Sequence, residues 1–265
     1  MITTLIITTY NWPEALELVL ISVKNQSILP TEVIIADDGS KNETKQLIEK
    51  YQTNFPVPLK HVWHEDSGFN KSMILNKAIV NAVGNYIIQS DGDCILHPHF
   101  VKDHLDFSEK GTYLFGCRVN IQKVYLNILF SKKQTRFNSF SKGIKKRSRA
   151  LHISILSQFY KKSNLFSKKY RGCNTSYFKA NAIAINGYNE DIKGWGREDS
   201  EFALRLHNLG IDGRRLRYRG IVFHIYHLEK AKDRLEINDD IEQKAILEKH
   251  VWCVNGIDKY LDEKQ

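Results

Sequence analysis

The chain has 265 residues with a formal net charge of +9, and 42% of its residues are hydrophobic. This length suits one α/β domain with an appended region, and this composition can bury a substantial core. No stretch approaches the about 18 consecutive apolar residues of a membrane span. The four cysteines lie far apart with no C-x-x-C pair, which fits neither a zinc module nor a disulfide scaffold and indicates a reducing cytoplasm.

The first part of the chain alternates strand and helix patterns with short connections, as a series of β-α-β units requires. The N-terminal run ITTLIITTY lacks the basic leader and cleavage site of a signal peptide and is expected to form the first strand. The predicted strands cover residues 2–8, 32–36, 59–63 and 86–88. The predicted helices cover residues 13–25, 42–52 and 71–83, with Gly84 as the stop signal of the third. This pattern predicts an open α/β sheet.

Three of these strands end in polar clusters, at Thr8-Thr9-Tyr10-Asn11, Asp37-Asp38-Gly39-Ser40 and Asp91-Gly92-Asp93. Because ligands of open α/β sheets bind outside the carboxyl ends of the strands, we expect the clusters to converge on one crevice. Two carboxylates about 5 Å apart repel by roughly 3 kcal/mol at an effective dielectric of about 20. Asp91 and Asp93 therefore favour a compensating cation, most simply Mg²⁺ or Mn²⁺, although D-G-D alone also suits a polar turn.

Glycine-rich phosphate loops are absent, so nucleotide binding would rest on side chains and a metal ion. A helix is predicted over residues 100–108 and a strand over residues 113–119. His97, His99 and His104 match no zinc-binding spacing, and we expect them to pack or to face solvent.

A basic block occupies the middle of the chain. No acidic residue lies between Glu109 and Glu190, and sixteen lysines and arginines lie from Arg118 to Lys179. Within the block, KGIKKRSR is followed by the apolar run LHISILSQFY, which predicts an amphipathic helix and a contact of residues 142–162 with an anionic membrane surface. A solvated loop, an anionic glycan contact and, least favoured, nucleic acid remain alternatives.

A second chemical centre is predicted at GWGRED, residues 194–199. Gly194 and Gly196 give a flexible backbone around Trp195, whose flat ring is a platform for a sugar. Glu198 and Asp199 open a helix predicted over residues 199–208. The helix dipole alone also accounts for carboxylates in a first turn.

A strand over residues 220–227 carries His224 and His227, either of which can complete the coordination of a Mn²⁺-like ion begun at Asp93. The basic residues Lys230, Lys232 and Arg234 follow, either as a mobile loop or as a cover over a pyrophosphate. The tail is expected to hold a mixed-charge helix over residues 240–251 and to pack through Trp252 and Tyr260.

Together, ITTYN, VIIADDGS, GNYIIQSDGD and GWGREDSEFALRL resemble a family 2 inverting glycosyltransferase with a GT-A fold. The second half is similar to the galactosyltransferase-type C-terminal region also found in chondroitin polymerases. The resemblance spans residues 2–120 and 170–230 and leaves the middle uncovered. It implies an α/β fold with a Rossmann-like nucleotide-binding half, a mixed central sheet and an acceptor-side C-terminal region. The implied boundaries are residues 1–118 for the nucleotide-sugar half, 119–170 for a basic insertion and 171–265 for the acceptor and base region.

The resemblance also implies donor-side roles. Tyr10 would stack on uracil and Asp38 would accept the hydrogen bond of its imide group. Asp93 would ligate Mn²⁺ or Mg²⁺, with Asp91 as a ribose or metal contact and His224 or His227 as a further ligand. The full nucleotide-binding set is Thr8, Tyr10, Asp38, Asp66, Lys71 and Asp91. Members of the family often have arginine where this chain has Lys71 or Asn76. The alternatives to a nucleotide-binding role are a helix cap for Asp38 and a core position for Tyr10.

On the acceptor side, the resemblance makes Asp199 the general base and Glu198 the residue that orients the acceptor or the base. The implied acceptor-binding residues are Gly194, Trp195, Gly196 and Arg197. Inverting transfer needs one base and a departing nucleoside diphosphate, and no nucleophile on the enzyme.

The expected function is metal-dependent transfer of a sugar from a UDP-sugar to a bacterial surface glycan or glycolipid, such as lipopolysaccharide core, O-antigen or capsule. The expected location is the cytoplasm or, as a peripheral protein, the inner face of the plasma membrane. A nucleotidyltransferase would also use paired aspartates but leaves GWGRED unexplained. A non-catalytic protein that binds glycans or nucleic acid through the basic block is the other alternative.

Overall fold

The computed structural model describes residues 1–228 and 232–261 and is built around a mixed eight-stranded sheet in the order β3-β2-β1-β4-β10-β6-β11-β9. The strands β3, β2, β1 and β4 are parallel, β10 is antiparallel to both β4 and β6, and β11 is parallel to β6. In sequence order the strands are β1 (Thr3–Thr9), β2 (Glu32–Asp37), β3 (Leu59–Trp63), β4 (Tyr86–Asp91), β6 (Thr112–Phe115), β9 (Lys162–Ser163), β10 (Asn174–Phe178) and β11 (Asp212–Arg215).

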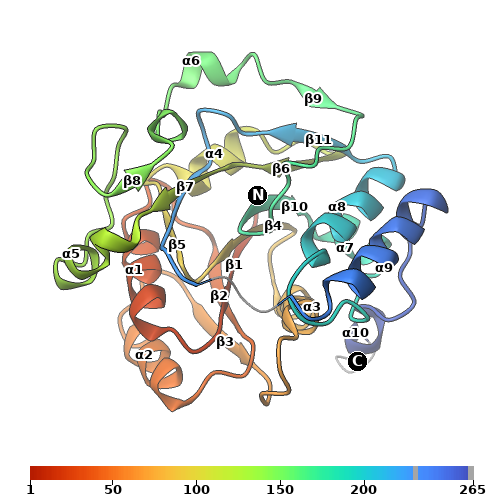
Figure 1. The fold of residues 1–265 in the computed structure, drawn as a ribbon, viewed down its shortest axis with the longest axis horizontal. Coiled ribbons are helices and arrows are strands. Elements are labelled where there is room, and N and C mark those ends of the chain that lie inside the picture. Colours follow the sequence, from red (N-terminus) through yellow and green to blue (C-terminus); the bar gives the residue numbers. More distant parts are fainter. Residues whose placement is uncertain (229–231, 262–265) are drawn as a thin grey trace.

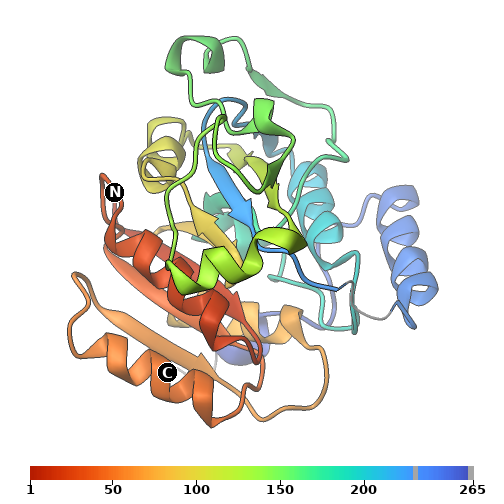
Figure 2. The ribbon, with the colours of Figure 1, turned by 60° about the vertical axis from the view of Figure 1, so that its left-hand side comes forward.

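Helices cover both faces of this sheet because successive side chains of a strand point to opposite sides. Leu5 and Ile7 of β1 pack against α1 (Pro13–Lys24), α2 (Asn42–Gln52) and α4 (Phe100–Asp106), whereas Ile6 between them faces α3 (Lys71–Asn81), α7 (Lys179–Ala184) and α8 (Glu198–Asn208). These two layers of helices stand on opposite sides of the sheet (Figures 1 and 2). The elements predicted before residue 92 are confirmed to within three residues, with the largest difference at the end of β4, and the α/β fold with a mixed sheet is confirmed as well.

A second, four-stranded sheet has the order β5-β12-β7-β8, with β5 (Cys94–Leu96), β7 (Cys117–Ile121), β8 (Ile144–Lys145) and β12 (Ile221–His224). The prediction of one strand over residues 113–119 is wrong, because the chain leaves the first sheet at Gly116 and enters the second. A Cβ atom on Gly116 would lie 2.2 Å from the carbonyl oxygen of Gly220, so only glycine fits this crossing. In the second sheet β12 pairs antiparallel with β5 and places His224 opposite Cys94.

The remaining helices are α5 (Leu126–Ser131), α6 (Ser154–Ser157), α9 (Leu235–Leu247) and α10 (Asp258–Leu261), with short 3₁₀ turns at Lys123–Tyr125 and Arg147–Arg149. The predicted amphipathic helix after the basic run is wrong, since α6 is only four residues long. Its apolar residues Ile155 and Phe159 remain exposed, so no packed face stabilises a longer helix.

The C-terminal segment differs in part from the prediction. The mixed-charge helix α9 begins at Leu235, earlier than expected, and packs beside α8. Tyr260 packs against the main core as predicted, whereas Trp252 is half-exposed. Within residues 1–228 and 232–261, no helix has the length and apolar character needed to cross a bilayer.

Candidate active site

The carboxyl ends of β1 and β4 meet at the predicted aspartate pair. Thr8 is the register partner of Asp91, and its hydroxyl group donates a hydrogen bond of 2.7 Å to Asp91 Oδ1. The backbone N–H of Gly92 then donates to the carbonyl oxygen of Thr8 at 2.6 Å. A Cβ atom on Gly92 would lie 2.9 Å from that oxygen, so glycine allows the chain to turn tightly from β4 into β5. This turn holds Asp91 and Asp93 at the edge of the sheet.

Asp93 lies against both histidines of the β12 segment. Its Oδ2 atom is 3.5 Å from Nε2 of His224 and 3.3 Å from Nε2 of His227, and the two nitrogens are 3.2 Å apart. Burial raises the pKa of Asp93, but the hydrogen bond with His227 and the charges of both histidines bring it down to about 2. One carboxylate and two imidazole nitrogens within 4.8 Å of one another form a donor set that fits a divalent cation such as Mn²⁺.

The predicted nucleotide-side residues lie at the ends of β1 and β2. Asp38 is buried, and its carboxylate contacts Nε2 of His64 at 2.8 Å and accepts a hydrogen bond from the backbone N–H of Asn70 at 3.0 Å. Tyr10 is exposed and donates a hydrogen bond of 2.9 Å to Oδ2 of Asp66. Neither structural alternative holds, because Asp38 caps no helix and Tyr10 is not in the core.

Asp199, the predicted base, lies in the first turn of α8. Its Oδ2 atom accepts a hydrogen bond of 2.9 Å from the backbone N–H of Gly172, while Oδ1 of Asp199 is buried without a hydrogen-bond partner among the described residues. Glu198 accepts a hydrogen bond of 3.1 Å from the backbone N–H of Gly196. Burial, followed by the neighbouring Asp199 carboxylate, raises the pKa of Glu198 to about 7, while Lys71 opposes the shift.

Lys71 joins the two centres. Its Nζ atom lies 3.2 Å from Asp91, 3.7 Å from Glu198 and 3.8 Å from Asp199. Burial lowers the pKa of Lys71, but the carboxylates of Asp199, Asp91 and Glu198 together raise it well above its ordinary value. The ammonium group is therefore held in its charged form between the donor-side and base-side carboxylates.

The GWG loop is fastened to α9. Gly194, Gly196 and Arg197 all have positive φ angles, which glycine adopts without strain. The guanidinium group of Arg197 pairs with Asp239 and lies 3.5 Å from Glu242, so it clamps the loop to α9. Trp195 is partly exposed beside the ammonium group of Lys232, which is 5.3 Å from the ring centre. Lys230, considered above as a cover for a pyrophosphate, lies outside the described residues.

Sequence reasoning missed Arg118 of β7. This half-buried guanidinium interacts electrostatically with Asp91 and Asp93, and its charge also lowers the pKa of His224 after the larger effect of burial. Its position was hidden because residues 113–119 read as one strand. Once the strand is split at Gly116, the alternation of buried and half-buried residues in CRVNI places Arg118 on the open face of the second sheet.

Another cluster brings together His97, Asp103 and His152. Asp103 accepts hydrogen bonds from Arg219 at 2.7 Å and from the backbone of Gly220 at 2.9 Å, and contacts His152 at 3.0 Å. The rings of His97 and His152 are stacked 4.6 Å apart, and burial lowers the pKa of His97 to about 4. These contacts indicate a packing role. His104 is fully buried between Ser176 and Asn174, so the packing prediction is confirmed for it.

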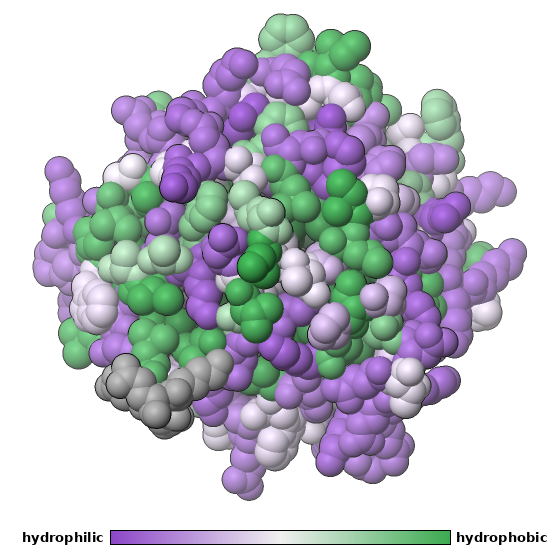
Figure 3. Space-filling view, turned by 180° about the vertical axis from the view of Figure 1, so that it is seen from behind, coloured by the Kyte–Doolittle hydropathy of each residue, from purple (hydrophilic) through white to green (hydrophobic). Residues whose placement is uncertain are grey.

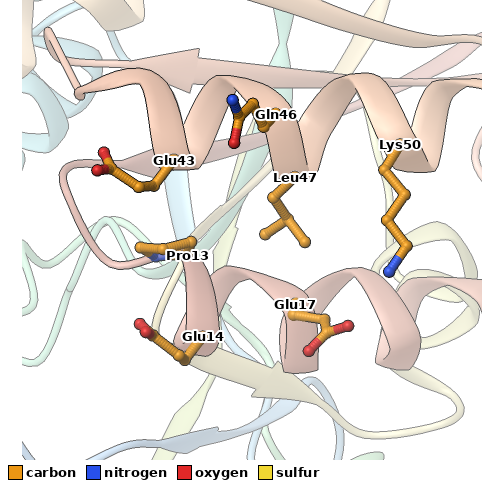
Figure 4. Close-up of a pocket in the computed structure, with 7 residues that line it drawn as sticks. All are labelled: Pro13, Glu14, Glu17, Glu43, Gln46, Leu47 and Lys50. Atoms are coloured by element: carbon orange, nitrogen blue, oxygen red, sulfur yellow. The ribbon is translucent and has the colours of Figure 1, made fainter.

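Two hollows lie apart from these carboxylates. One, of about 330 Å³, runs between α1 and α2 and is lined by acidic side chains, Leu47 and Lys50 (Figure 4). The other, of about 290 Å³, is lined by residues that include Lys41 and Trp63. Neither lining includes a predicted site residue.

Glu198→Gln is expected to stabilise the fold selectively at alkaline pH. Because the pKa of Glu198 in the folded protein lies above the ordinary 4.5, its contribution to stability is complete below about pH 4.5 and is lost as the pH rises through about 7. Glutamine has no proton to lose, so the Tm advantage of the variant should grow by a few degrees between about pH 5 and about pH 8. The exposed change Glu65→Gln is the control, and a pH-independent difference for Glu198→Gln would contradict the assignment.

Comparison with known families gives two matches. The model of "Glycosyl transferase family 2" matches residues 4–168, and that of the "N-terminal domain of galactosyltransferase" matches residues 152–228. The two matches also include the middle of the chain, which the motifs left uncovered.

Similar proteins include curated sequences and solved structures. The chain is 26% identical over 223 residues to the chondroitin synthase of Escherichia coli, which covers 78% of this chain and 32% of that protein. It superposes on S. aureus TarS in complex with UDP with a TM-score of 0.65 at 18% identity, covering 93% of this chain and 66% of that one. For the mannosyltransferase PcManGT of Pyrobaculum calidifontis in complex with GDP-Man and Mn²⁺, the TM-score is 0.57 at 17% identity. This match covers 94% of this chain and 62% of that one.

The chain spans only 23% to 32% of the length of the first three curated relatives. The likeness to the solved structures confirms the predicted GT-A fold.

Proposed function

Since the chain belongs to glycosyl transferase family 2, we propose that it is a metal-dependent inverting enzyme that transfers a sugar from a UDP-sugar to a bacterial surface glycan or glycolipid. The observation that carries this proposal is the position of Lys71, whose ammonium group lies 3.2 Å from Asp91 and 3.8 Å from Asp199. Asp91, the proposed donor-side carboxylate, and Asp199, the proposed base, thus both lie next to the ammonium group of Lys71. Direct displacement needs donor and base this close, because it uses no nucleophile on the enzyme.

In the proposed reaction, Asp199 accepts the proton of the acceptor hydroxyl group as its oxygen attacks the anomeric carbon of the donor sugar. The bond from that carbon to the β-phosphate oxygen breaks, and UDP leaves with the bonding electrons, so a single displacement inverts the configuration. Asp199 suits this role because the N–H of Gly172 fixes one oxygen while the other has no hydrogen-bond partner among the described residues. Glu198 orients the acceptor, and Gly194, Trp195, Gly196 and Arg197 form the acceptor side.

The donor nucleotide would lie at the ends of β1, β2 and β4. We assign the uracil ring to a stack on Tyr10 and its imide N–H to Asp38, which has lone pairs left beyond its contacts with His64 and Asn70. The other donor-side residues are Thr8, Asp66, Lys71, Asp91 and Arg118.

Asp93 with His224 or His227 would hold the divalent ion. When bound, Mn²⁺ or Mg²⁺ supplies positive charge that stabilises the leaving diphosphate. Arg118, which interacts electrostatically with Asp91 and Asp93, would add a second positive charge on the same side.

Similar proteins support the donor and acceptor classes. A UDP donor is supported by the likeness to S. aureus TarS in complex with UDP, and a surface glycan acceptor by the similarity to a chondroitin synthase. We propose a lipopolysaccharide core, O-antigen or capsule as the acceptor and the inner face of the plasma membrane as the location. The basic segment 142–162 would then lie near anionic lipid.

Binding of nucleotides with Mn²⁺ tests the donor assignment. UDP with Mn²⁺ should raise the Tm, because a ligand at about 100 times its Kd stabilises the folded state by about 2.7 kcal/mol. GDP and CMP should give smaller shifts, and a panel of UDP-sugars should release UDP when Mn²⁺ is present. An equal response to all nucleotides would contradict the uracil assignment, and release of pyrophosphate from UTP would favour a nucleotidyltransferase.

Gly172→Ala is expected to lower the transfer rate by displacing the base. A Cβ atom at this position would lie 1.9 Å from Oδ1 of Asp199, so the carboxylate must rotate away and lose its hydrogen bond to the backbone. General-base catalysis is worth about 10²- to 10⁴-fold, and we expect kcat to fall by at least about tenfold with UDP binding unchanged. Gly210→Asn, at a positive-φ position in open space, is the control. An unchanged kcat in Gly172→Ala would show that Asp199 need not occupy this position.

A further inference from the structure

Residues 151–169 form an arm that projects from the body of the protein. We call it the α6–β9 arm; it contains α6 and β9 and lies along the upper edge in two views (Figures 1 and 2). The strand β9 is the edge strand of the large sheet and pairs only two residues with β11. Tyr170, directly after the arm, is buried in the main core.

Specific contacts hold the arm in place at its beginning and at its middle. His152 contacts the buried carboxylate of Asp103 at 3.0 Å, and the next backbone N–H donates to the carbonyl oxygen of Tyr218 at 3.1 Å. Further along, Arg214 donates a hydrogen bond of 3.0 Å to the carbonyl oxygen of Tyr160. The arm is therefore a displayed surface and not a loosely attached loop.

The arm exposes large apolar side chains between these anchors and beyond them. Ile155 is 78% exposed, Phe159 is 76% exposed and Leu165 is 75% exposed. Hydrophobic residues stand out at the upper edge of the molecule when it is seen from behind, among hydrophilic neighbours (Figure 3). Removing side chains of this size from water is favourable, so a partner that covers the arm gains affinity from each of them.

Positive charge surrounds these apolar groups. Ten lysines and arginines lie from Lys142 to Arg171, in a stretch without acidic residues. Of the lysines in the arm, Lys162 pairs with Glu109 at 2.6 Å, while Lys161, Lys168 and Lys169 are exposed. A second copy of this chain would bring like charges together. Nucleic acid would use the charge but leaves the aliphatic side chains unexplained.

We propose that the α6–β9 arm docks the protein on the surface of an anionic lipid bilayer. Ile155, Phe159 and Leu165 enter the boundary between headgroups and acyl chains, and the lysines lie among the headgroups. The arm acts through a few inserted side chains, and not through the amphipathic helix expected from the sequence. This inference rests on the proposed membrane location, and its test does not depend on sugar transfer.

Flotation with vesicles tests the arm. The unmodified chain should float with vesicles that contain phosphatidylglycerol and much less with pure phosphatidylcholine. The apolar variant carries three substitutions, Ile155→Ser, Phe159→Ser and Leu165→Ser, and its affinity for anionic vesicles should fall by about tenfold or more. A second triple variant, with Lys161→Gln, Lys168→Gln and Lys169→Gln, should lose affinity for anionic vesicles to a similar extent. The matched control is Leu247→Ser, Val254→Ser, which removes apolar side chains that are 79% and 89% exposed elsewhere and should change nothing.

Three results would overturn the docking proposal. The first is that the apolar variant floats as well as the unmodified chain. The second is that the unmodified chain forms a dimer and the apolar variant does not. The third is that the chain binds RNA through the lysines but does not bind vesicles. UDP binding with Mn²⁺ is measured in parallel on every variant and should stay constant. Absence of UDP binding by the unmodified chain would count against the proposed donor, whereas an unmodified chain that binds UDP but does not float with anionic vesicles would count against the arm alone.

Discussion

Asp199→Asn is expected to lower the kcat of sugar transfer by about 10²- to 10⁴-fold, because the amide cannot accept the proton of the acceptor hydroxyl group. The amide keeps the size of the side chain and can still accept a hydrogen bond through its oxygen, so the contact with the N–H of Gly172 can persist. UDP binding should change little, since Asp199 is on the proposed acceptor side and its distance to Lys71 Nζ, 3.8 Å, is longer than the 3.2 Å of the donor-side Asp91.

The measurement is steady-state transfer together with the affinity for UDP and Mn²⁺. Asp240→Asn makes the same chemical change on an exposed helix position and should leave both unchanged. A variant at Asp199 that keeps full kcat would exclude this residue as the base. Glu198, whose pKa is raised to about 7, would then be the next residue to test.

The nucleotide-binding half could be predicted because its signals are local. The alternation around Leu5, Ile6 and Ile7 and the helical spacing of Leu16, Val19 and Val23 specify which face each element buries. The polar residues at the carboxyl ends of β1 and β4 then meet, as the hydrogen bond between Thr8 and Asp91 confirms. No contact with the rest of the chain was needed to predict these elements.

The rest of the site depends on contacts between distant parts of the chain. His224 reaches Asp93 because β12 pairs with β5, and the sequence between them does not encode that register in any local pattern. Lys71 was assigned to the nucleotide alone, yet it also contacts carboxylates of α8. Arg118 was missed because Gly116, which separates two strands, reads as an ordinary residue within one strand.

Asp93→Ala is expected to abolish the response of transfer to Mn²⁺. A bound divalent ion contributes several kcal/mol to the stabilisation of a leaving diphosphate, and each 1.36 kcal/mol corresponds to tenfold in rate, so activity should fall on the order of 10³-fold. Asp93 is the only carboxylate of its donor set, since the other two members are His224 and His227. Mn²⁺ binding itself, followed by the loss of the electron paramagnetic resonance signal of the free ion, should weaken in parallel.

Measuring Mn²⁺ binding also distinguishes whether His224 or His227 is the metal ligand. Nε2 of His227 is nearer to Asp93, at 3.3 Å against 3.5 Å, but His224 is fixed within β12, whereas His227 lies beyond the strand and is more exposed. A ligand held by a strand loses less conformational freedom when the ion binds. We therefore expect His224→Ala to weaken Mn²⁺ binding more than His227→Ala, with His207→Ala as the control. The reverse order would assign the ligand to His227, and unchanged Mn²⁺ affinity in Asp93→Ala would move the metal site away from this cluster.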